Sequence, residues 1–315
     1  MYNNFELGTR LKVNDLVVNW HLTEACNYRC NYCYAAWSQP PEAHALWRDA
    51  KRSYQLLSEI GKFFSVENNA NPLFRMMEWN DVRLSLAGGE PLILGKRFRQ
   101  VVHQAESLGF KVSMITNGSL LDSDTLTWLC PKLDMLGISI DAEESKLNHL
   151  IGRQNSRGET ISSERLVSII DKARSINPKL KIKLNTVVNQ QNWDADLTAI
   201  ISRCQPDRWK ILRVLPSISE AHAISSEMFA YFLDTHKDYH SFMSIEDNSE
   251  MDKSYIMIDP HGRFFQNNLA SRYQNEYVYS DEILKVGVND AFNQIEFDSS
   301  RFVSRYTRLD GVIAA

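Results

Sequence analysis

Short apolar segments of strand length alternate with longer stretches of helical period over the first two thirds of the chain. This alternation is typical of repeated βα units around a parallel sheet. The apolar segments predict strands over residues 16–22, 82–87, 111–115, 134–140, 180–187 and 208–214. Helices are predicted between them over residues 42–64, 96–108, 122–130, 162–176 and 193–203. We therefore expect an α/β fold, a partial (β/α)6 barrel.

The pattern changes after about residue 216, where a helix is predicted over 225–236 and then the hairpin SYIMIDPHGRFFQ, whose Pro-His-Gly sequence supplies the turn. Residues 143–160 contain turn-forming residues without a clear period, and are predicted to form a long functional loop. We expect residues 1–215 to form the barrel with an N-terminal cysteine loop. Residues 216–315 are expected to form an α+β extension that packs on the barrel and caps the active site.

The composition is that of a globular protein with a substantial core, because 43% of the 315 residues are hydrophobic and 10% are aromatic. Lys and Arg together number 35 against 39 Asp and Glu, which gives a net charge of −4. This balance disfavours a polynucleotide partner but leaves a small basic pocket open. No apolar run is long enough to cross a bilayer, and the first residues lack the apolar block of a secretory signal. We expect a cytoplasmic protein without membrane attachment.

Three of the five cysteines, Cys26, Cys30 and Cys33, fall within eight residues. Such clustering favours metal chemistry in a reducing compartment over a disulfide framework. Thiolates with this C-x3-C-x2-C spacing on one open loop can hold three irons of a [4Fe–4S] cluster. The fourth iron then has no protein ligand in the motif and is free to bind a small molecule.

A zinc site is the alternative for the same loop, since zinc also accepts three cysteines and one histidine. His21 or His44 would supply the fourth ligand. The two remaining cysteines, Cys130 and Cys204, are interpreted as small buried residues, and two are too few for a second cluster.

The segment NWHLTEACNYRCNYCYAAW resembles the cluster loop of the radical S-adenosylmethionine (SAM) enzymes, including the aromatic Tyr32 before the last cysteine. A second motif agrees, because the strand predicted over 82–87 runs directly into Gly88-Gly89-Glu90-Pro91. Two glycines allow a backbone to approach a ligand closely. The resemblance implies a partial radical SAM barrel in which the open iron binds SAM, with Tyr32 and the Gly-Gly-Glu motif beside it.

Asn117 and Ser139 stand at the ends of the third and fourth predicted strands. The carboxyl ends of the strands are where a βα barrel places its ligand-binding residues. We therefore expect both side chains to contact SAM.

Cationic side chains recur on one face of three predicted strands. Side chains alternate along a strand, so the apolar face should lie under the helices and the charged face should point into the barrel. The charged faces carry Arg83, Lys183 with Asn185, and Arg208 with Lys210. Several buried ammonium and guanidinium groups imply an anion that neutralises them, and a triphosphate has the required charge and acceptor oxygens.

Several further segments resemble the viperin-like radical SAM enzymes, in the same order, from about Asn19 to residue 298. They are Arg83 four residues before AGGEP, LIGR ending at Arg153, KLNTVVN from Lys183, DRWK ending at Lys210, SYIMID with Tyr255, and LKVGVNDA. The resemblance implies conversion of a ribonucleoside triphosphate (CTP, UTP or GTP) to its 3′-deoxy-3′,4′-didehydro analogue, a chain terminator in antiviral, here anti-phage, defence. A 5′-deoxyadenosyl radical from SAM would remove the ribose 4′ hydrogen, and the 3′ hydroxyl would leave as water.

The same resemblance implies a role for individual residues. Those expected at the triphosphate and ribose are Asn19, Arg83, Lys183, Asn185, Arg208 and Lys210. Arg153 would lie near SAM and substrate, and Tyr255 would close over the ribose as the candidate hydrogen or proton donor. The expected partner is an external one-electron reductase of the flavodoxin or ferredoxin type.

Two other functions stay open at this point. One is a different radical SAM reaction on a phosphorylated nucleotide in cofactor synthesis, such as the rearrangement of a purine nucleotide. The other, from a different class, is a zinc-stabilised binding module without catalytic turnover.

Overall fold

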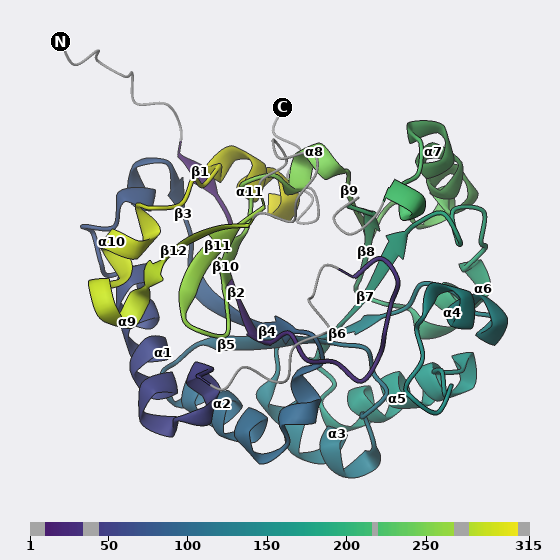
Figure 1. The fold of residues 1–315 in the computed structure, drawn as a ribbon, viewed down its shortest axis with the longest axis horizontal. Helices are drawn as coiled ribbons and strands as arrows, with labels where there is room; N and C mark the ends of the chain where they lie inside the picture. Colours follow the sequence, from purple (N-terminus) through teal and green to yellow (C-terminus); the bar gives the residue numbers. More distant parts are fainter. Residues whose placement is uncertain (1–9, 34–43, 216–219, 268–276, 308–315) are drawn as a thin grey trace.

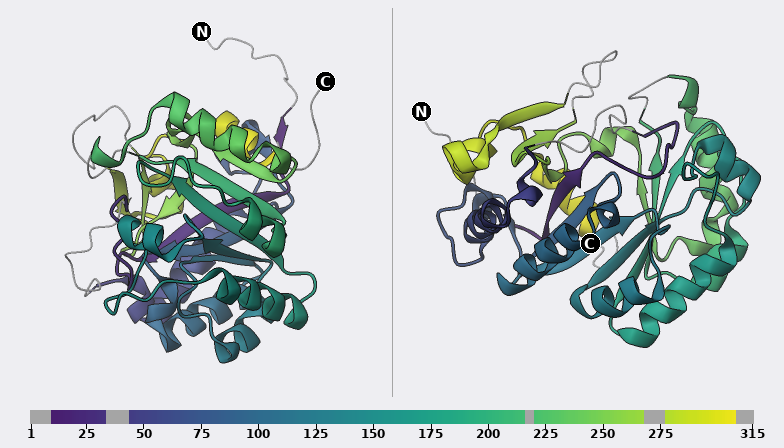
Figure 2. Two further views of the ribbon diagram at one scale, coloured as in Figure 1. Left: turned by 90° about the vertical axis from the view of Figure 1, so that its right-hand side faces the viewer. Right: turned by 60° about the horizontal axis from the view of Figure 1, so that its bottom comes forward.

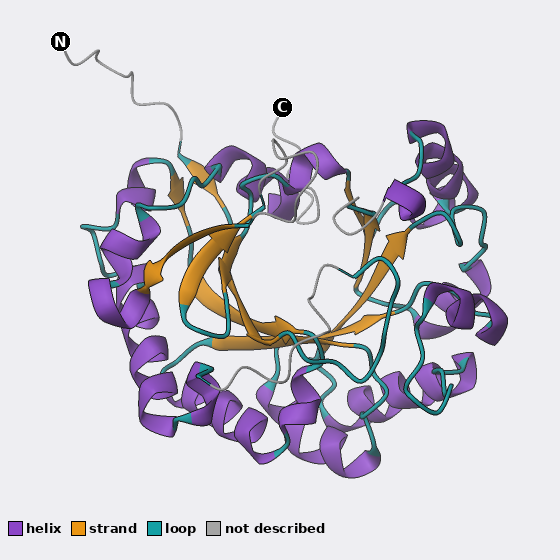
Figure 3. Ribbon diagram, in the orientation of Figure 1, coloured by secondary structure: helices purple, strands orange, loops and turns teal. Residues whose placement is uncertain are grey.

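A computed structural model describes residues 10–33, 44–215, 220–267 and 277–307 and shows one strongly curved sheet with helices on its outer face (Figures 1 and 3). Its ten strands follow the order β12-β11-β10-β2-β4-β5-β6-β7-β8-β9. Neighbours from β10 to β9 are parallel, whereas β11 and β12 are antiparallel to their neighbours. The strands are β2 Asp15–Thr23, β4 Asp81–Gly88, β5 Lys111–Thr116, β6 Met135–Ser139, β7 Lys181–Val188, β8 Arg208–Arg213, β9 Met243–Glu246, β10 Ile256–Ile258, β11 Arg263–Gln266 and β12 Val278–Glu282.

Helices cover the outer face of the parallel part of the sheet (Figure 2). The longer ones are α1 Ala50–Phe64, α2 Lys96–Ser107, α3 Ser123–Leu129, α4 Ser145–Ile151, α5 Ser163–Ile176, α6 Thr198–Cys204, α7 Ser226–Thr235 and α11 Ser299–Thr307. The shorter ones are α8 Asn248–Met251, α9 Ile283–Val286 and α10 Val288–Phe292, and a two-stranded pair joins β1 Leu11–Lys12 to β3 Met77–Glu78. None of the helices within these ranges has the length and apolar character that crossing a membrane requires.

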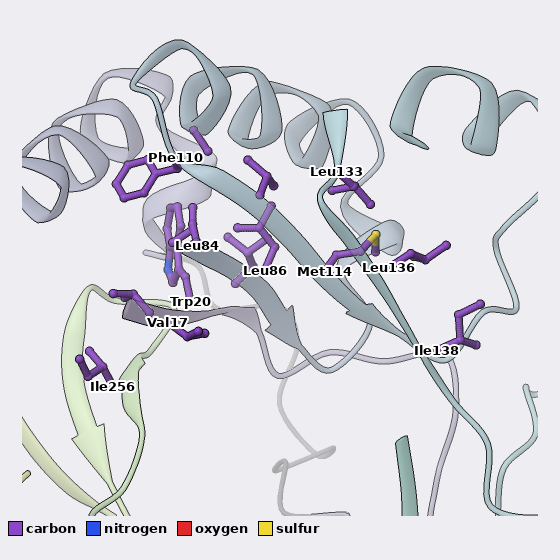
Figure 4. Packing of buried hydrophobic residues seen from close by; sticks show 14 of the residues in the cluster. Val17, Trp20, Leu84, Leu86, Phe110, Met114, Leu133, Leu136, Ile138 and Ile256 are labelled. Carbon is purple, nitrogen blue, oxygen red and sulfur yellow. The ribbon is translucent and has the colours of Figure 1, made fainter. Parts of the chain in front are cut away.

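The core lies between the sheet and these helices. In β4, Leu84 and Leu86 are fully buried, and they pack near Trp20 of β2 in the layer under the helices (Figure 4). The intervening Arg83 and Ser85 line the cavity on the opposite, concave face. Burying a leucine side chain contributes about 1.5–3 kcal/mol, so this alternation fixes which face of each strand meets the cavity.

All six strands of the predicted barrel are confirmed to within two residues at each end, and so is the Pro-His-Gly hairpin between β10 and β11. The helix predicted over 42–64 is a short 3-10 turn followed by α1, which Asp49 caps; residues 42 and 43 lie outside the described residues. The helix predicted from residue 193 begins only at Thr198.

One prediction is wrong, since residues 143–160 are not a continuous loop but contain α4. This helix of seven residues ends at Gly152, whose φ is +81°, and it buries only Asn148 and Ile151. A helix so short, with two buried positions, leaves no readable period in the sequence. The division of the chain at residue 215 stays a prediction. Strands β9 to β12 of the C-terminal part extend both ends of the same sheet.

Candidate active site

A cavity lies against the concave face of the sheet, and all but one of the predicted site residues line it. They are Asn19, Cys26, Cys30, Tyr32, Cys33, Arg83, Gly88, Gly89, Asn117, Ser139, Arg153, Lys183, Asn185, Arg208, Lys210 and Tyr255. The exception is Glu90, which is fully buried behind the wall. The cavity lining also contains residues that the sequence did not indicate, among them Tyr28, Phe265, Tyr277 and Arg305.

The cysteine loop follows β2 and is held against the end of α4. The backbone amides of Arg29 and Asn31 donate to the carbonyls of Gly152 and Ile151, at 3.2 and 2.9 Å. Within the loop, the Tyr28 amide donates to Cys26 Sγ at 3.3 Å. These hydrogen bonds fix the conformation of the loop, whose three cysteines line the cavity.

The three thiols fit an iron–sulfur cluster by their chemistry. None is in a disulfide, all three line the same cavity, and in a cluster each would bind a different iron. Burial raises the pKa of Cys26 to about 11, so the thiolate there needs nearby positive charge such as iron supplies. A zinc ion instead needs its donors gathered around one point, and no such group of three His, Cys, Asp or Glu side chains occurs in the described part of the chain.

The Gly88-Gly89 turn at the end of β4 touches the cysteine loop directly. The Gly89 amide donates to the Thr23 carbonyl at 2.6 Å. A Cβ atom would lie 2.3 Å from the Thr23 oxygen at Gly88 and 2.2 Å from the Ala25 oxygen at Gly89. Any larger residue would push the cysteine loop away, which explains why both positions are glycine.

Glu90 holds this turn from behind. Its carboxylate accepts from the Asn117 amide at 2.7 Å, the Leu92 amide at 3.1 Å and the Thr116 hydroxyl at 2.8 Å. Burial raises its pKa to about 7, even though these hydrogen bonds oppose the shift. The structure therefore shows Glu90 joining the ends of β4 and β5, and a contact with SAM stays a prediction. Asn117 itself donates to Asn27 Oδ1 at 2.8 Å, which ties β5 to the cysteine loop.

Arg153, Tyr32 and Ser139 meet around Asp141, which is fully buried. Arg153 forms an ion pair with Asp141 at 3.2 Å and donates to the Ser139 carbonyl at 2.8 Å. The Tyr32 hydroxyl donates to the same Asp141 carboxylate. Burial opposes the charge of Arg153, but Asp141, Tyr32 and Cys30 together outweigh it and raise the pKa of Arg153 well above its usual value. Asp141 ends the fourth predicted strand, but its place at the centre of this network was not foreseen.

The predicted cations converge on adjacent strands. Lys183 of β7 is in register with Arg208 of β8, and Asn185 is in register with Lys210. Lys183 has no ion pair among the described residues, and burial together with Lys210 and Arg208 lowers its pKa well below the usual value. The side chain of Asn185 is buried at 7% exposure, and neither of its amide atoms has a hydrogen-bond partner. A buried amide of this kind needs a hydrogen-bond partner, which a bound ligand or water can supply.

Glu246, Tyr255 and Arg305 complete this side of the cavity. Glu246 of β9 forms ion pairs with Lys210 at 2.9 Å and with Arg305 of α11 at 2.8 Å. The Tyr255 hydroxyl donates to Glu246 and accepts from Lys210 at 2.8 Å. Tyr255 is thus placed among the cations, and its role as a hydrogen or proton donor stays a prediction.

The sequence reasoning missed Glu246 and Arg305. Glu246 ends a strand of four residues, which is too short to give a clear alternation. Arg305 lies on α11. The apolar residues Phe302 and Val303, which are buried, could have indicated a helix with one buried face.

Comparisons with known proteins agree on one family. The family model described as "Radical SAM superfamily" matches residues 20–198. An S-adenosylmethionine-dependent nucleotide dehydratase of Psychrobacter lutiphocae is 40% identical over 98% of this chain and 99% of its own length. The S-adenosylmethionine-dependent nucleotide dehydratase RSAD2 of Siniperca chuatsi is 30% identical over 91% of this chain and 77% of its own length. Among solved structures, anSMEcpe with bound AdoMet shares the fold, with a TM-score of 0.63 at 12% identity, over 92% of this chain and 82% of that one.

Proposed function

Since this chain belongs to the radical SAM superfamily and to the viperin-like SAM-dependent nucleotide dehydratases within it, we propose that it dehydrates a ribonucleoside triphosphate. The product would be the 3′-deoxy-3′,4′-didehydro analogue of CTP, UTP or GTP, acting as a chain terminator against phage. Membership of an enzyme family leaves no place for a non-catalytic zinc module. The relatives are nucleotide dehydratases, which argues against a nucleotide rearrangement in cofactor synthesis.

The observation that carries the triphosphate assignment is the charge of the cavity wall. Seven of the described lining residues are cationic, and none of the described lining residues is Asp or Glu. The cations are Arg83, Arg153, Lys183, Arg208, Lys210, Arg213 and Arg305. Five of them form ion pairs with carboxylates that lie outside the lining, whereas Lys183 and Arg208 have no ion pair in the described part of the chain. Because an uncompensated charge in a buried site costs several kcal/mol, these two cations make the wall suited to an anion.

Four of these cations are proposed to hold the phosphates. Arg83, Lys183, Arg208 and Lys210 project from the concave faces of β4, β7 and β8, on the strand positions that alternate with core residues. Guanidinium groups bind phosphate oxygens in pairs, and ammonium groups bind them as point charges. Asn19 of β2 and Asn185 would add neutral hydrogen bonds to the ribose or phosphates.

The cysteine side of the cavity is proposed to hold the cofactors. Cys26, Cys30 and Cys33 would bind three irons of a [4Fe–4S] cluster, and Gly88, Gly89, Asn117, Ser139 and Arg153 would surround SAM. With the cluster and SAM both bound, and the cluster reduced by an external flavodoxin- or ferredoxin-type protein, the site would supply a 5′-deoxyadenosyl radical. The chain's own contribution is to place the ribose between the two sides, since a displacement of about 1 Å can reduce a rate about a hundredfold.

The proposal is tested by the substrate dependence of SAM cleavage. Protein with a reconstituted cluster is incubated with SAM, dithionite and one nucleotide at a time, and 5′-deoxyadenosine is measured. We expect at least one of CTP, UTP and GTP to raise the yield well above the rate without nucleotide. The matching nucleoside, which lacks the phosphates, is expected to be at least about a hundredfold less effective. Equal turnover of the nucleoside and its triphosphate would show that the cations do not bind phosphate.

A further inference from the structure

Glu246 is a buried carboxylate among the cations of the cavity, at 2% exposure. One of its oxygens lies 2.9 Å from Lys210 Nζ and 2.8 Å from Arg305 Nε, and the other accepts from the Tyr255 hydroxyl. Burial raises the pKa of this carboxyl, but the two cations and the Tyr255 hydrogen bond together outweigh burial and lower the pKa to about 2. Glu246 is therefore an anion placed directly behind the site that is proposed to bind phosphate.

Both terminal nitrogens of Arg305 donate hydrogen bonds to the protein. Its Nη1 donates to the Ser254 carbonyl at 2.6 Å, its Nη2 donates to the Glu250 carbonyl at 3.1 Å and to the Ser254 hydroxyl, and its Nε faces Glu246. Its guanidinium also stacks on the Tyr255 ring at 3.7 Å. These hydrogen bonds and the ion pair with Glu246 hold the guanidinium in place, although its Nε makes no hydrogen bond in the described part of the chain.

We propose that Glu246 and Arg305 are positioning residues that set the place and the charge of the Lys210 ammonium group, and so couple helix α11 to anion binding. The proposal deepens the proposed function and depends on it in one respect, that Lys210 binds the phosphates. Helix α11 has a second connection to the same wall, because Arg208 donates to the Arg305 carbonyl at 3.3 Å and to Ser244 at 2.7 Å.

The two residues act on Lys210 with opposite signs. Burial lowers the pKa of Lys210 to about 8; Glu246 opposes this shift, whereas Arg305 and Arg208 add to it. The charged or titratable groups that act on Lys210 are Glu246 from β9, Arg208 from β8, Lys183 from β7, Tyr255 beside β10 and Arg305 from α11. Arg83 of β4 and Tyr306 of α11 act on the neighbouring cations Lys183 and Arg208. An anion binds the protonated amine, so the affinity for phosphate should fall as the pH rises through the pKa of Lys210.

The test is the pH dependence of tripolyphosphate binding to the full chain with its cluster, measured by calorimetry for E246Q, R305Q, R305K and the unmodified protein. In the unmodified protein the affinity is expected to fall as the pH passes about 8. Loss of the Glu246 charge should move this midpoint down by about one pH unit or more, and loss of the Arg305 charge should move it up. R305K keeps the charge and should retain the original midpoint.

The opposite signs separate a positioning role from a structural one. Breaking a buried ion pair from either side would impair folding in the same way, so shifts in the same direction, or no shift in either variant, would overturn the proposal. Tripolyphosphate itself titrates identically in every sample, so differences in the midpoint between variants come from the protein. The control variant K181M removes an exposed lysine of β7 that is paired with Asp207, and it should leave the midpoint unchanged. If E246Q does not fold, R305Q against R305K decides.

Tripolyphosphate also separates this inference from the proposed function, since it has no ribose to dehydrate. Tripolyphosphate binding with the expected shifts, but without any dehydrated nucleotide, would leave the inference standing and remove the proposed function. The absence of tripolyphosphate binding at every pH would remove both the phosphate site and the role of Glu246.

Discussion

Replacing Cys30 by alanine is expected to abolish SAM cleavage, with 5′-deoxyadenosine falling at least roughly a thousandfold, because ligands that act as a unit cannot substitute for one another. Cys30 lines the cavity and lies between the two other cysteines of the loop in the sequence. With two thiolates left, the loop cannot hold three irons. The variant should contain little iron and sulfide after anaerobic reconstitution, and its brown colour should be lost.

C130A is the matched control for this result. Cys130 is fully buried in the core and does not line the cavity. Its replacement should lower the free energy of unfolding by about 1 kcal/mol and leave iron content and turnover unchanged. A Cys30 variant that kept a normal cluster and normal turnover would show that the three-cysteine loop is not the cluster site.

Replacing Lys183 by methionine is expected to change activity and stability in opposite directions. Loss of a charged hydrogen bond to phosphate, about 1.5–3 kcal/mol, should lower kcat/KM for the triphosphate by roughly 10- to 150-fold. Lys183 is a buried ammonium group without an ion pair in the described part of the chain, and its pKa is lowered mainly by burial. A lysine with a lowered pKa destabilises the fold below its unfolded pKa, so the variant should unfold at a higher temperature at neutral pH.

K181M provides the comparison, because Lys181 lies on the same strand but is exposed and paired with Asp207 at 3.0 Å. Its loss should change neither kcat/KM nor the unfolding temperature by much, since exposed ion pairs contribute about 0–1 kcal/mol. If K183M retained full kcat/KM, or if both variants lost it equally, Lys183 would not be a phosphate ligand.

The barrel and most of the cavity wall could be predicted from the sequence because two signals are local. Strands alternate buried and cavity-facing residues, so Ile182 and Lys183 could be assigned to opposite faces from their consecutive positions in the strand alone. The three cysteines and the two glycines are set by close contacts within one loop and one turn, which also leave a recognisable spacing in the sequence.

The remainder of the site depends on long-range contacts that have no local signature. Glu246 reaches Lys210 only because β9 pairs with β8. Arg305 reaches Glu246 from helix α11, which begins 53 residues after the end of β9 (299 − 246). For Glu90 the motif predicted a ligand contact, which stays a prediction, whereas the hydrogen bond that its carboxylate accepts from the Asn117 backbone was not indicated by the sequence. In each case the sequence shows the residue type, and the partner is decided by packing.

The most direct test of the central claim uses a triphosphate that carries deuterium on the ribose 4′ carbon. The reconstituted protein is incubated with this substrate, SAM and dithionite, and the masses of the nucleotide and of 5′-deoxyadenosine are then measured. The account predicts a nucleotide product that has lost the 4′ deuterium and the 3′ hydroxyl, with that deuterium recovered in 5′-deoxyadenosine. A nucleotide that keeps all its atoms, or unlabelled 5′-deoxyadenosine beside a dehydrated product, would contradict it.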